Sequence, residues 1–304
     1  MLTIVCAFFV FLMFYDINSF IDASRRGFLL FTTNVLPILF PFFFLTSFMT
    51  FSGIFSGTPR LLSVVTSKLY KVDGKAAPVL LLSLVGGFPT SARMLSELYE
   101  RGELSRTDAI KISTFTSTTS PIFIIGTVGV ALYGNVQLGV IIFVATVMGA
   151  LMNGLLYRNL SFKEDIIHEH TKSHHATTSN QQDISTAISN ALTSSIQSIL
   201  SVGGLIVIFF ILGNQLDVLL NLSPVFDAAL SSLLEMTVGV FKASSITPQS
   251  LIPVAILSFG GLCVGLQGML FFRKFHMPLW FYLLYKVTHM LLSIGVAIII
   301  LSIF

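Results

Sequence analysis

The sequence has little charge, little cysteine and a single tryptophan. Only 10% of its 304 residues are charged, whereas a soluble domain carries roughly 25%. This shortage of ionic surface excludes a water-soluble enzyme, a nucleic-acid-binding protein and a disordered chain. A net charge of +3 is too small to indicate a nucleic-acid surface. The two cysteines, Cys6 and Cys263, lie in apolar runs far apart in sequence, so we expect neither a disulfide framework nor a zinc site.

Apolar residues dominate instead, at 54% of the chain with 29 phenylalanines and a mean hydropathy of +0.88. This composition predicts an all-α polytopic membrane protein. A spanning helix needs about 20 apolar residues, and such runs lie at residues 28–54, 109–133, 136–157, 191–212, 251–272 and 279–304. The N-terminal run 1–15 is shorter and spans only if residues 17–20 extend it. Because no Lys or Arg precedes Arg25, we expect a retained helix rather than a cleaved signal peptide.

One long polar stretch, residues 158–190, divides the chain into two similar halves. It contains four histidines, and histidine-rich tracts can bind metal. A solvated linker is the favoured interpretation, because no carboxylate or cysteine set with fixed ligand spacing accompanies them. The histidines are His168, His170, His174 and His175.

Two further segments are interrupted where an ordinary span would continue. Residues 76–99 run apolar into Gly86-Gly87-Phe88-Pro89 and then become amphipathic, and residues 222–242 contain Pro224 and Glu235. An interruption frees backbone groups that lipid cannot satisfy, so it is tolerated only inside protein or along a wet cavity. We therefore predict that both segments are re-entrant helical hairpins.

The positive-inside rule favours the first hairpin, but it distinguishes less between a second hairpin and a second segment that crosses the membrane. With two hairpins, one face collects most of the Lys and Arg residues and the other keeps Arg25, Arg26 and Lys242. The N-terminus, the 55–75 loop and the linker then lie on the cytoplasmic side of the cell membrane. We predict two inverted repeats, each with a hairpin and a broken helix, as in many secondary transporters. The predicted divisions are an N-terminal helix and connector (1–27), a first repeat (28–157), the linker (158–190) and a second repeat (191–304).

The predicted broken helices occupy corresponding positions in the two halves. The run from Ser113 to Ser120 is rich in hydroxyls and ends at Pro121, and proline disrupts the preceding helical turn. In the second half, Gly260 and Gly261 interrupt residues 251–272. Paired interruptions point to a binding site at the middle of the membrane. Close helix packing through small residues is an alternative for the glycines, but it does not explain the hydroxyl cluster.

Few ionisable residues fall at membrane depth, and each is a functional candidate because it is costly there. Arg93 suits a carboxylate or phosphate, but Glu97 lies four residues away, so a structural ion pair is an equal alternative. Glu235 has no nearby cation in sequence and requires a proton, an ion, a distant partner or water. Lys286 is expected to snorkel to an interface.

Four motifs in order resemble one family: GFPTSA from Gly87, TTSPIFIIG from Thr118, EMTVG from Glu235 and GGLCVGLQ from Gly260. The chain resembles the sporulation integral membrane proteins of Gram-positive bacteria. Their paired nucleoside-recognition (gate) domains are related to concentrative nucleoside transporters, and the best-understood member function is dipicolinate transport into the spore. Two departures from the family's pattern are hydroxyls in place of its asparagines and Gly265 in place of its histidine. The resemblance implies a solute site formed by Gly87, Pro89, Thr90, Ser91, Arg93, Ser117, Thr118, Thr119, Ser120, Glu235, Thr237, Gly260, Gly261 and Gln267.

The sequence and the resemblance together predict a secondary transporter that works by alternating access. Its solute would be a small organic anion, such as a dipicolinate-like carboxylate, or a nucleoside-like molecule, with Na⁺ or H⁺ coupling through Glu235. No enzyme motif and no cofactor is expected; the partners are the solute and the lipid bilayer, and homo-oligomerisation is left open. The alternatives are a non-transporting assembly or sporulation factor and an intramembrane metal-ion permease. The permease is disfavoured because no Cys/His/Asp set lies at membrane depth.

Overall fold

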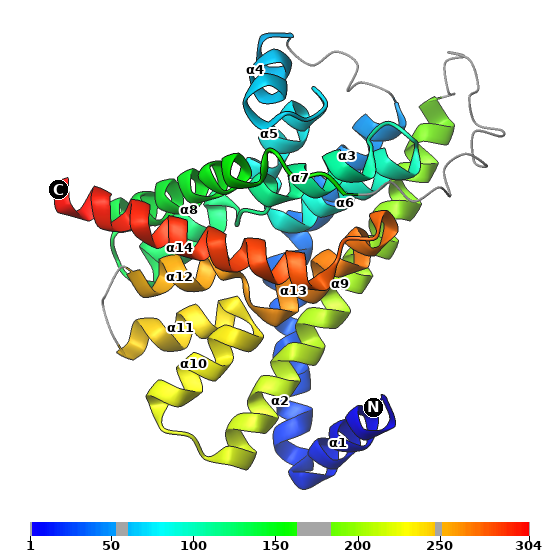
Figure 1. Cartoon of the computed structure of the whole chain (residues 1–304). Helices are drawn as coiled ribbons and strands as arrows, with labels where there is room; N and C mark the ends of the chain where they lie inside the picture. Colours follow the sequence, from blue (N-terminus) through cyan, green and yellow to red (C-terminus); the bar gives the residue numbers. More distant parts are fainter. Residues whose placement is uncertain (1, 53–59, 163–183, 247–250, 304) are drawn as a thin grey trace.

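The protein is a bundle of helices that cross one another (Figure 1). Its structure is a computed structural model that describes residues 2–52, 60–162, 184–246 and 251–303, and no strand occurs within these ranges. Four helical stretches are long and apolar enough to cross a membrane, as the hydropathy predicts. The chain is therefore an all-α, multi-pass membrane protein. The four are α8 (Val136–Tyr157), α9 (Ile184–Leu220), Leu251–Phe275 and α14 (Leu279–Ile303).

The chain bends sharply near its N-terminus. Helix α1 (Leu2–Tyr15) meets α2 (Ile17–Leu30) at 104°, and the pair forms at most one further span. The carboxylate of Asp16 accepts a hydrogen bond of 3.0 Å from the Ser19 N–H, which caps the start of α2. Residues 17–20 thus begin a new helix instead of extending the first. Helix α2 continues through the π-helical η1 (Phe31–Val35) into α3 (Leu36–Phe51).

The long helices pair in antiparallel fashion. Gly27 of α2 lies against Val207 of α9, whereas the later Phe31 lies against the earlier Gly203. Helices α8 and α14 behave alike, since Gly149 approaches Ser293 and Asn153 accepts a hydrogen bond of 2.6 Å from Thr288. Glycine at these crossings lets the helix axes approach closely.

Both predicted hairpin segments fold back on themselves. Helix α4 (Arg60–Tyr70) leads into α5 (Ala76–Gly86) and α6 (Phe88–Glu100). The two ends of this hairpin meet, because the Lys75 ammonium donates to the Glu103 carbonyl at 3.0 Å. The second hairpin is formed by α10 (Pro224–Leu234) and α11 (Met236–Ile246), and an ion pair of 2.6 Å between Asp227 and Lys242 joins its ends.

Both predicted broken helices are interrupted where the sequence indicates. Helix α7 (Arg106–Thr116) ends before a non-helical stretch, and η3 (Ile122–Leu132), a π-helix, continues beyond Pro121. Helix α12 (Leu251–Phe259) gives way to α13 (Gly261–Phe272) through Gly260, whose φ is +87°, and the 3-10 turn η5 (Arg273–Phe275) follows. A positive φ suits glycine because it has no Cβ.

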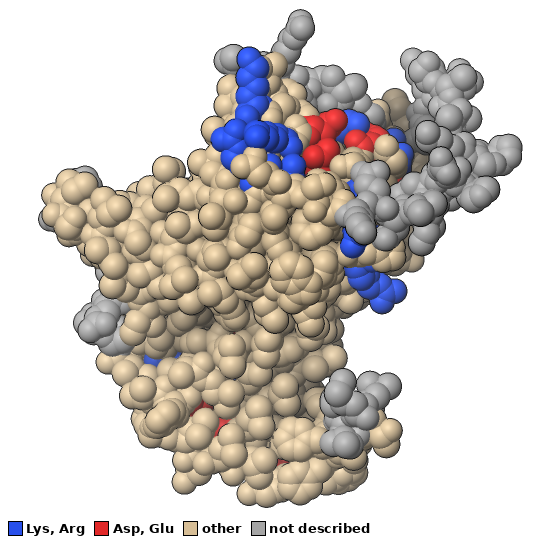
Figure 2. Space-filling model, in the orientation of Figure 1, with Lys and Arg blue, Asp and Glu red and all other residues tan. Residues whose placement is uncertain are grey.

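Charged side chains gather at one end of the molecule, over α4 and the ends of α5–α7, whereas most of the surface in view is uncharged (Figure 2). The two halves meet there, because Lys274 pairs with Glu100 at 2.7 Å. At the same end, Lys71 after α4 donates to Asn159 after α8 at 2.7 Å. The last part of the predicted linker, from Ile184, belongs to α9. The four histidines lie outside the described residues.

Candidate functional site

Within each half, the hairpin tip packs on the break of the neighbouring helix. A Cβ atom at Gly87, the tip of the first hairpin, would lie 3.2 Å from the Ser120 nitrogen and 3.6 Å from the Thr118 carbonyl oxygen. A Cβ atom at Gly261 would lie 3.1 Å from the Ser232 carbonyl oxygen at the end of α10. Both glycines have positive φ, at +77° and +74°. Each contact is therefore backbone against backbone, and the positive φ and the short distance both favour glycine.

The two halves also meet at these breaks. The hydroxyl of Thr119, in the first break, donates to the Leu257 carbonyl of α12 at 3.3 Å and lies 4.0 Å from the Met236 sulfur of the second hairpin. Phe88, the first residue of α6, packs its ring against Gly268 of α13. All four interruptions thus lie at one junction, although they are far apart in sequence.

The helices that begin at the junction are capped unequally. The carboxylate of Glu235 accepts from the Val238 N–H of α11 at 2.9 Å, and the Ser120 hydroxyl accepts from the Phe123 N–H of η3 at 3.4 Å. Helices α6 and α13 have glycine at the N-cap, Gly87 and Gly260, and no side-chain cap. The positive ends of these two helix dipoles are therefore left without a side-chain acceptor.

Glu235 occupies the break of the second hairpin and is only 5% exposed. Its carboxylate faces the start of α11, where Thr237 also bonds to it. The cation nearest in sequence, Lys242, is paired with Asp227 instead. Glu235 therefore has a helix N-terminus, rather than a basic side chain, as its electrostatic partner.

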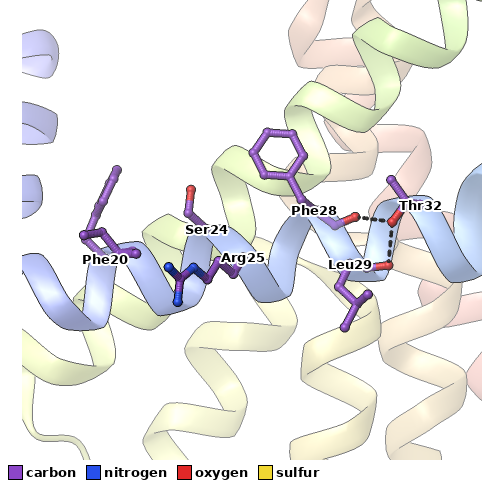
Figure 3. A pocket seen from close by; sticks show the side chains of 7 residues that line it. Phe20, Ser24, Arg25, Phe28, Leu29 and Thr32 are labelled. Carbon is purple, nitrogen blue, oxygen red and sulfur yellow. Dashed lines mark hydrogen bonds between the residues drawn. The ribbon is translucent and has the colours of Figure 1, made fainter.

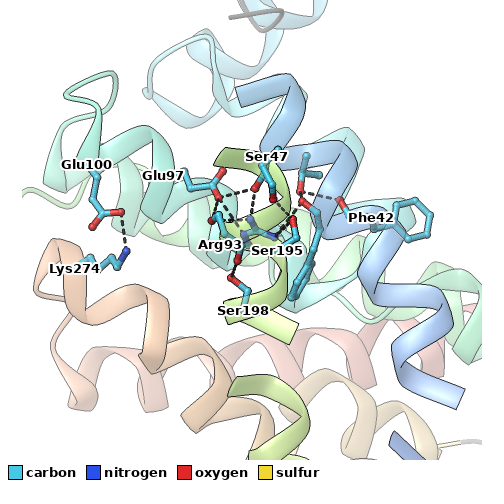
Figure 4. Close-up of polar contacts among 12 residues, drawn as sticks. Phe42, Ser47, Arg93, Glu97, Glu100, Ser195, Ser198 and Lys274 are labelled. Carbon is cyan, nitrogen blue, oxygen red and sulfur yellow. Dashed lines mark hydrogen bonds and ion pairs between the residues drawn. The ribbon is translucent and has the colours of Figure 1, made fainter. Parts of the chain in front are cut away.

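Arg93 lies two turns beyond the first hairpin tip and is 1% exposed (Figure 4). Its Nε atom pairs with Glu97 at 3.0 Å. The remaining four N–H groups donate to α3 and α9, so all five donors are satisfied within the protein. Arg93 thus fastens the first hairpin to both long helices. The other acceptors are the Phe43 carbonyl at 3.0 Å and the hydroxyls of Ser195 at 3.3 Å, Ser194 at 2.8 Å and Ser47.

The other predicted site residues divide between the junction and local helix contacts. Thr118 is buried at the first break, and its hydroxyl has no hydrogen-bond partner among the described residues. The hydroxyls of Thr90, Ser91 and Ser117 instead donate to backbone carbonyls of α5, α6 or α7. The Gln267 amide bonds within α13 to the Cys263 sulfur at 3.3 Å, and Pro89 is the second residue of α6.

Sequence reasoning missed the importance of α14. Lys286 does not snorkel: it is 2% exposed, and its ammonium lies 5.7 Å from the centroid of the Phe88 ring. Tyr282, one turn earlier, is also buried, and its hydroxyl has no hydrogen-bond partner within the described part of the chain. His289, one turn later, lies 2.9 Å from the Thr146 carbonyl through its ring nitrogen. The spacing of these three residues, four and then three apart, places them on one face of a helix.

A surface groove lies away from the junction. It has a volume of about 540 Å³ and follows the outer face of α2 (Figure 3). All its lining residues belong to α2 and its continuation, most are apolar, and Arg25 is the charged side chain among them. None of the predicted site residues lines this groove.

Comparison with known proteins confirms the resemblance that the motifs indicate. Residues 32–137 match the Gate family, described as nucleoside recognition. The chain is similar to the sporulation integral membrane protein YlbJ of Bacillus subtilis (strain 168), with 27% identity over 301 aligned residues that cover 87% of this chain and 74% of the relative. No solved structure matches the chain.

Proposed function

We propose that the protein is a secondary transporter that moves a small organic anion across the cell membrane by alternating access. One observation carries this proposal: two hairpin tips and two helix breaks meet inside an apolar helical bundle. Freed backbone groups at membrane depth are tolerated when they line a solute site, and discontinuous helices form such sites in many secondary transporters. The match to a nucleoside-recognition family supports a solute-binding role.

In this proposal the two halves form an inverted repeat around the junction. The order of elements is the same in both halves: a long helix, a hairpin, a broken helix and a second long helix. The corresponding long helices, α3 with α9 and α8 with α14, run antiparallel. The hairpins move against the long helices to open the junction to either side, and an H⁺ or Na⁺ gradient drives the movement. The N-terminus is cytoplasmic.

The test is solute uptake into proteoliposomes that carry a pH or Na⁺ gradient. The solutes are pyridine-2,6-dicarboxylate (dipicolinate), other small carboxylates and nucleosides. Thr118→Val removes an unpartnered hydroxyl at the junction without changing its shape, and we expect it to slow uptake by roughly 3- to 10-fold, the value of one hydrogen bond. Thr116→Val is the matched control, because that hydroxyl bonds to Ile112 within its own helix. Absence of gradient-dependent uptake for every solute would contradict the proposal.

A second candidate is a non-transporting membrane factor in sporulation. The relative's name gives a process rather than a solute, and the cavity beside Lys286 measures only about 50 Å³. In that case no solute would raise the thermal stability of the purified protein, whereas a ligand that binds only the folded state does so by mass action. A metal permease would require a set of metal ligands at membrane depth; among the described residues, no group of three His, Cys, Asp or Glu side chains is placed to hold a metal ion.

A further inference from the structure

Lys286 is a buried cation without an anion. It is 2% exposed, and none of its hydrogen atoms is donated to an acceptor among the described residues. Burial of a charge without a partner is costly, and a membrane protein keeps such a residue where it serves a function. The Phe88 ring, 5.7 Å away, offers only a weak cation–π contact in compensation. Among the described residues, Lys286 therefore lacks a negatively charged hydrogen-bond acceptor.

A second unsatisfied donor lies beside Lys286. The hydroxyl of Tyr282 is buried and bonds to none of the residues that the structure describes, and both side chains line a cavity of about 50 Å³ between α13 and α14. Gly265 lines the same cavity, and a Cβ atom there would lie 3.3 Å from the Tyr282 ring. A cavity of this size holds a small polar group, since one water needs roughly 10–15 Å³.

The backbone adds further positive potential at this place. Gly260 and Gly261 begin α13 next to Lys286, and Gly260 leaves that helix N-terminus without a side-chain cap. Phe88 begins α6, which is also uncapped. The acid that could compensate, Glu235, faces the start of α11 instead and forms no ion pair with Lys286. His289 faces the Thr146 carbonyl.

We propose that Lys286, Tyr282 and the N-terminus of α13 form a subsite that binds one carboxylate group. The three contribute an ammonium, an O–H and backbone N–H groups, which are all donors, and the other side chains that line the cavity are apolar. Such a set suits an anion with several acceptor oxygens. This proposal rests on the proposed transport function. It specifies the solute further, as an anion rather than a neutral nucleoside.

Two kinds of molecule could bring a carboxylate group into this cavity. A transported solute would come from the junction, where Phe88 and Gly260 lie close to Lys286. A fatty acid reaches it from the bilayer, because Leu262, Leu266 and Leu283 line the same cavity and are exposed on the outer surface. The chemistry at Lys286 is the same for both, so the test includes a probe for each source.

Ligand-dependent thermal unfolding of the purified full-length protein in a non-ionic detergent tests the subsite. The probes are pyridine-2,6-dicarboxylate, its neutral diamide and decanoate. We expect the dicarboxylate to raise the melting temperature and the diamide to have no effect. Lys286→Met should abolish the rise. Tyr282→Phe keeps the charge of Lys286 and should raise the dissociation constant of the dicarboxylate about tenfold, the value of one charge-assisted hydrogen bond. Lys242→Met, a lysine with its own ion pair, is the matched control and should keep the full rise.

The outcomes separate the subsite from the transport function. An unchanged rise in Lys286→Met, or an equal rise with the diamide, overturns the subsite. A rise with decanoate alone supports the carboxylate subsite and overturns its assignment to the solute. Gradient-driven uptake that is unaffected by Lys286→Met leaves transport standing without this subsite. Binding that depends on Lys286 in a protein that shows no uptake leaves the subsite standing and contradicts transport.

Discussion

The ammonium of Lys286 lies 5.7 Å from the centroid of the Phe88 ring. This contact joins the last helix of the second half to the tip of the first hairpin. Both residues are buried, at 2% and 4% exposure, and Gly268 packs against the same ring. Any movement of the first hairpin relative to α14 therefore changes the surroundings of an unpaired charge. The position of the hairpin and the occupancy of an anion site at Lys286 are expected to depend on each other.

A double-mutant cycle measures the coupling free energy between Phe88 and Lys286. Phe88→Leu should lower the free energy of unfolding in detergent micelles, because it removes the ring from Lys286 and from Phe272, whose centroid lies 5.9 Å away. Part of that loss should vanish in a Lys286→Met background, and the coupling should be about 0.5–2 kcal/mol, the value of a cation–π contact. The control cycle pairs Phe88→Leu with Lys242→Met and should give no coupling. Equal coupling in both cycles would show that the Lys286 contact contributes nothing.

Gly261→Ala should disrupt the contact between α13 and the second hairpin. The residue has a φ of +74°, and its new methyl group would lie 3.1 Å from the Ser232 carbonyl oxygen. Positive φ alone costs a non-glycine residue about 1–2 kcal/mol, and the close contact adds to this. Gly204→Ala in α9 is the control: its Cβ atom would meet nothing within 4 Å, so it should raise stability by about 0.5–1 kcal/mol. Thermal unfolding of the two variants gives the comparison, and equal stability would contradict this account.

The interruptions of the helices could be predicted because they are local. A double glycine, or a proline that follows hydroxyls, changes the backbone wherever it occurs in an apolar run. Gly87, Pro121 and Gly260 therefore mark the breaks in the sequence as they do in the structure. Asp16 is a similar local signal, an N-cap residue before Ile17, but the apolar run on either side of it obscured the bend.

The electrostatics of the junction could not be predicted, because they depend on which helix faces pack together. A single lysine in an apolar helix has the same hydropathy signature whether it snorkels or is buried, so the sequence does not distinguish the buried position of Lys286 from an interfacial one. The neighbours of Arg93 come from α3 and α9, roughly 50 and 100 positions away, and only tertiary structure brings them to its donors. Glu97 is the one partner of Arg93 that the sequence reveals, through its i, i+4 spacing.

Arg93→Met should unfold the protein at a markedly lower temperature. It leaves Glu97 buried without its cation and removes the hydrogen bonds that join α6 to α3 and α9, and breaking a buried pair from one side costs about 3–5 kcal/mol. The double variant Arg93→Met/Glu97→Gln should be more stable than Arg93→Met alone, because no unpaired charge remains. Arg26→Met, at an exposed ion pair, should change stability by less than about 1 kcal/mol. A double variant as unstable as the single one would assign the loss to packing instead.

Labelling of single cysteines should show that each hairpin returns to the face from which it starts. In a protein with Cys6 and Cys263 replaced by alanine, cysteines at Lys71 and Arg101 flank the first hairpin, and cysteines at Asn221 and Ser245 flank the second. All four positions are exposed. A membrane-impermeant maleimide should reach the first two from one side of sealed vesicles and the last two from the other side.

The ion contacts at the hairpin ends are the physical reason for this pattern. Lys75 bonds to Glu103, and Asp227 pairs with Lys242, so neither segment can cross the bilayer without separating groups that lie within 3.0 Å of each other. Vesicles opened with detergent provide the control, since all four cysteines should then react. If Lys71 and Arg101 react from opposite sides, α5 and α6 together form a crossing. Gly87 would then lie within a continuous span, and the junction could not open by movement of a hairpin tip.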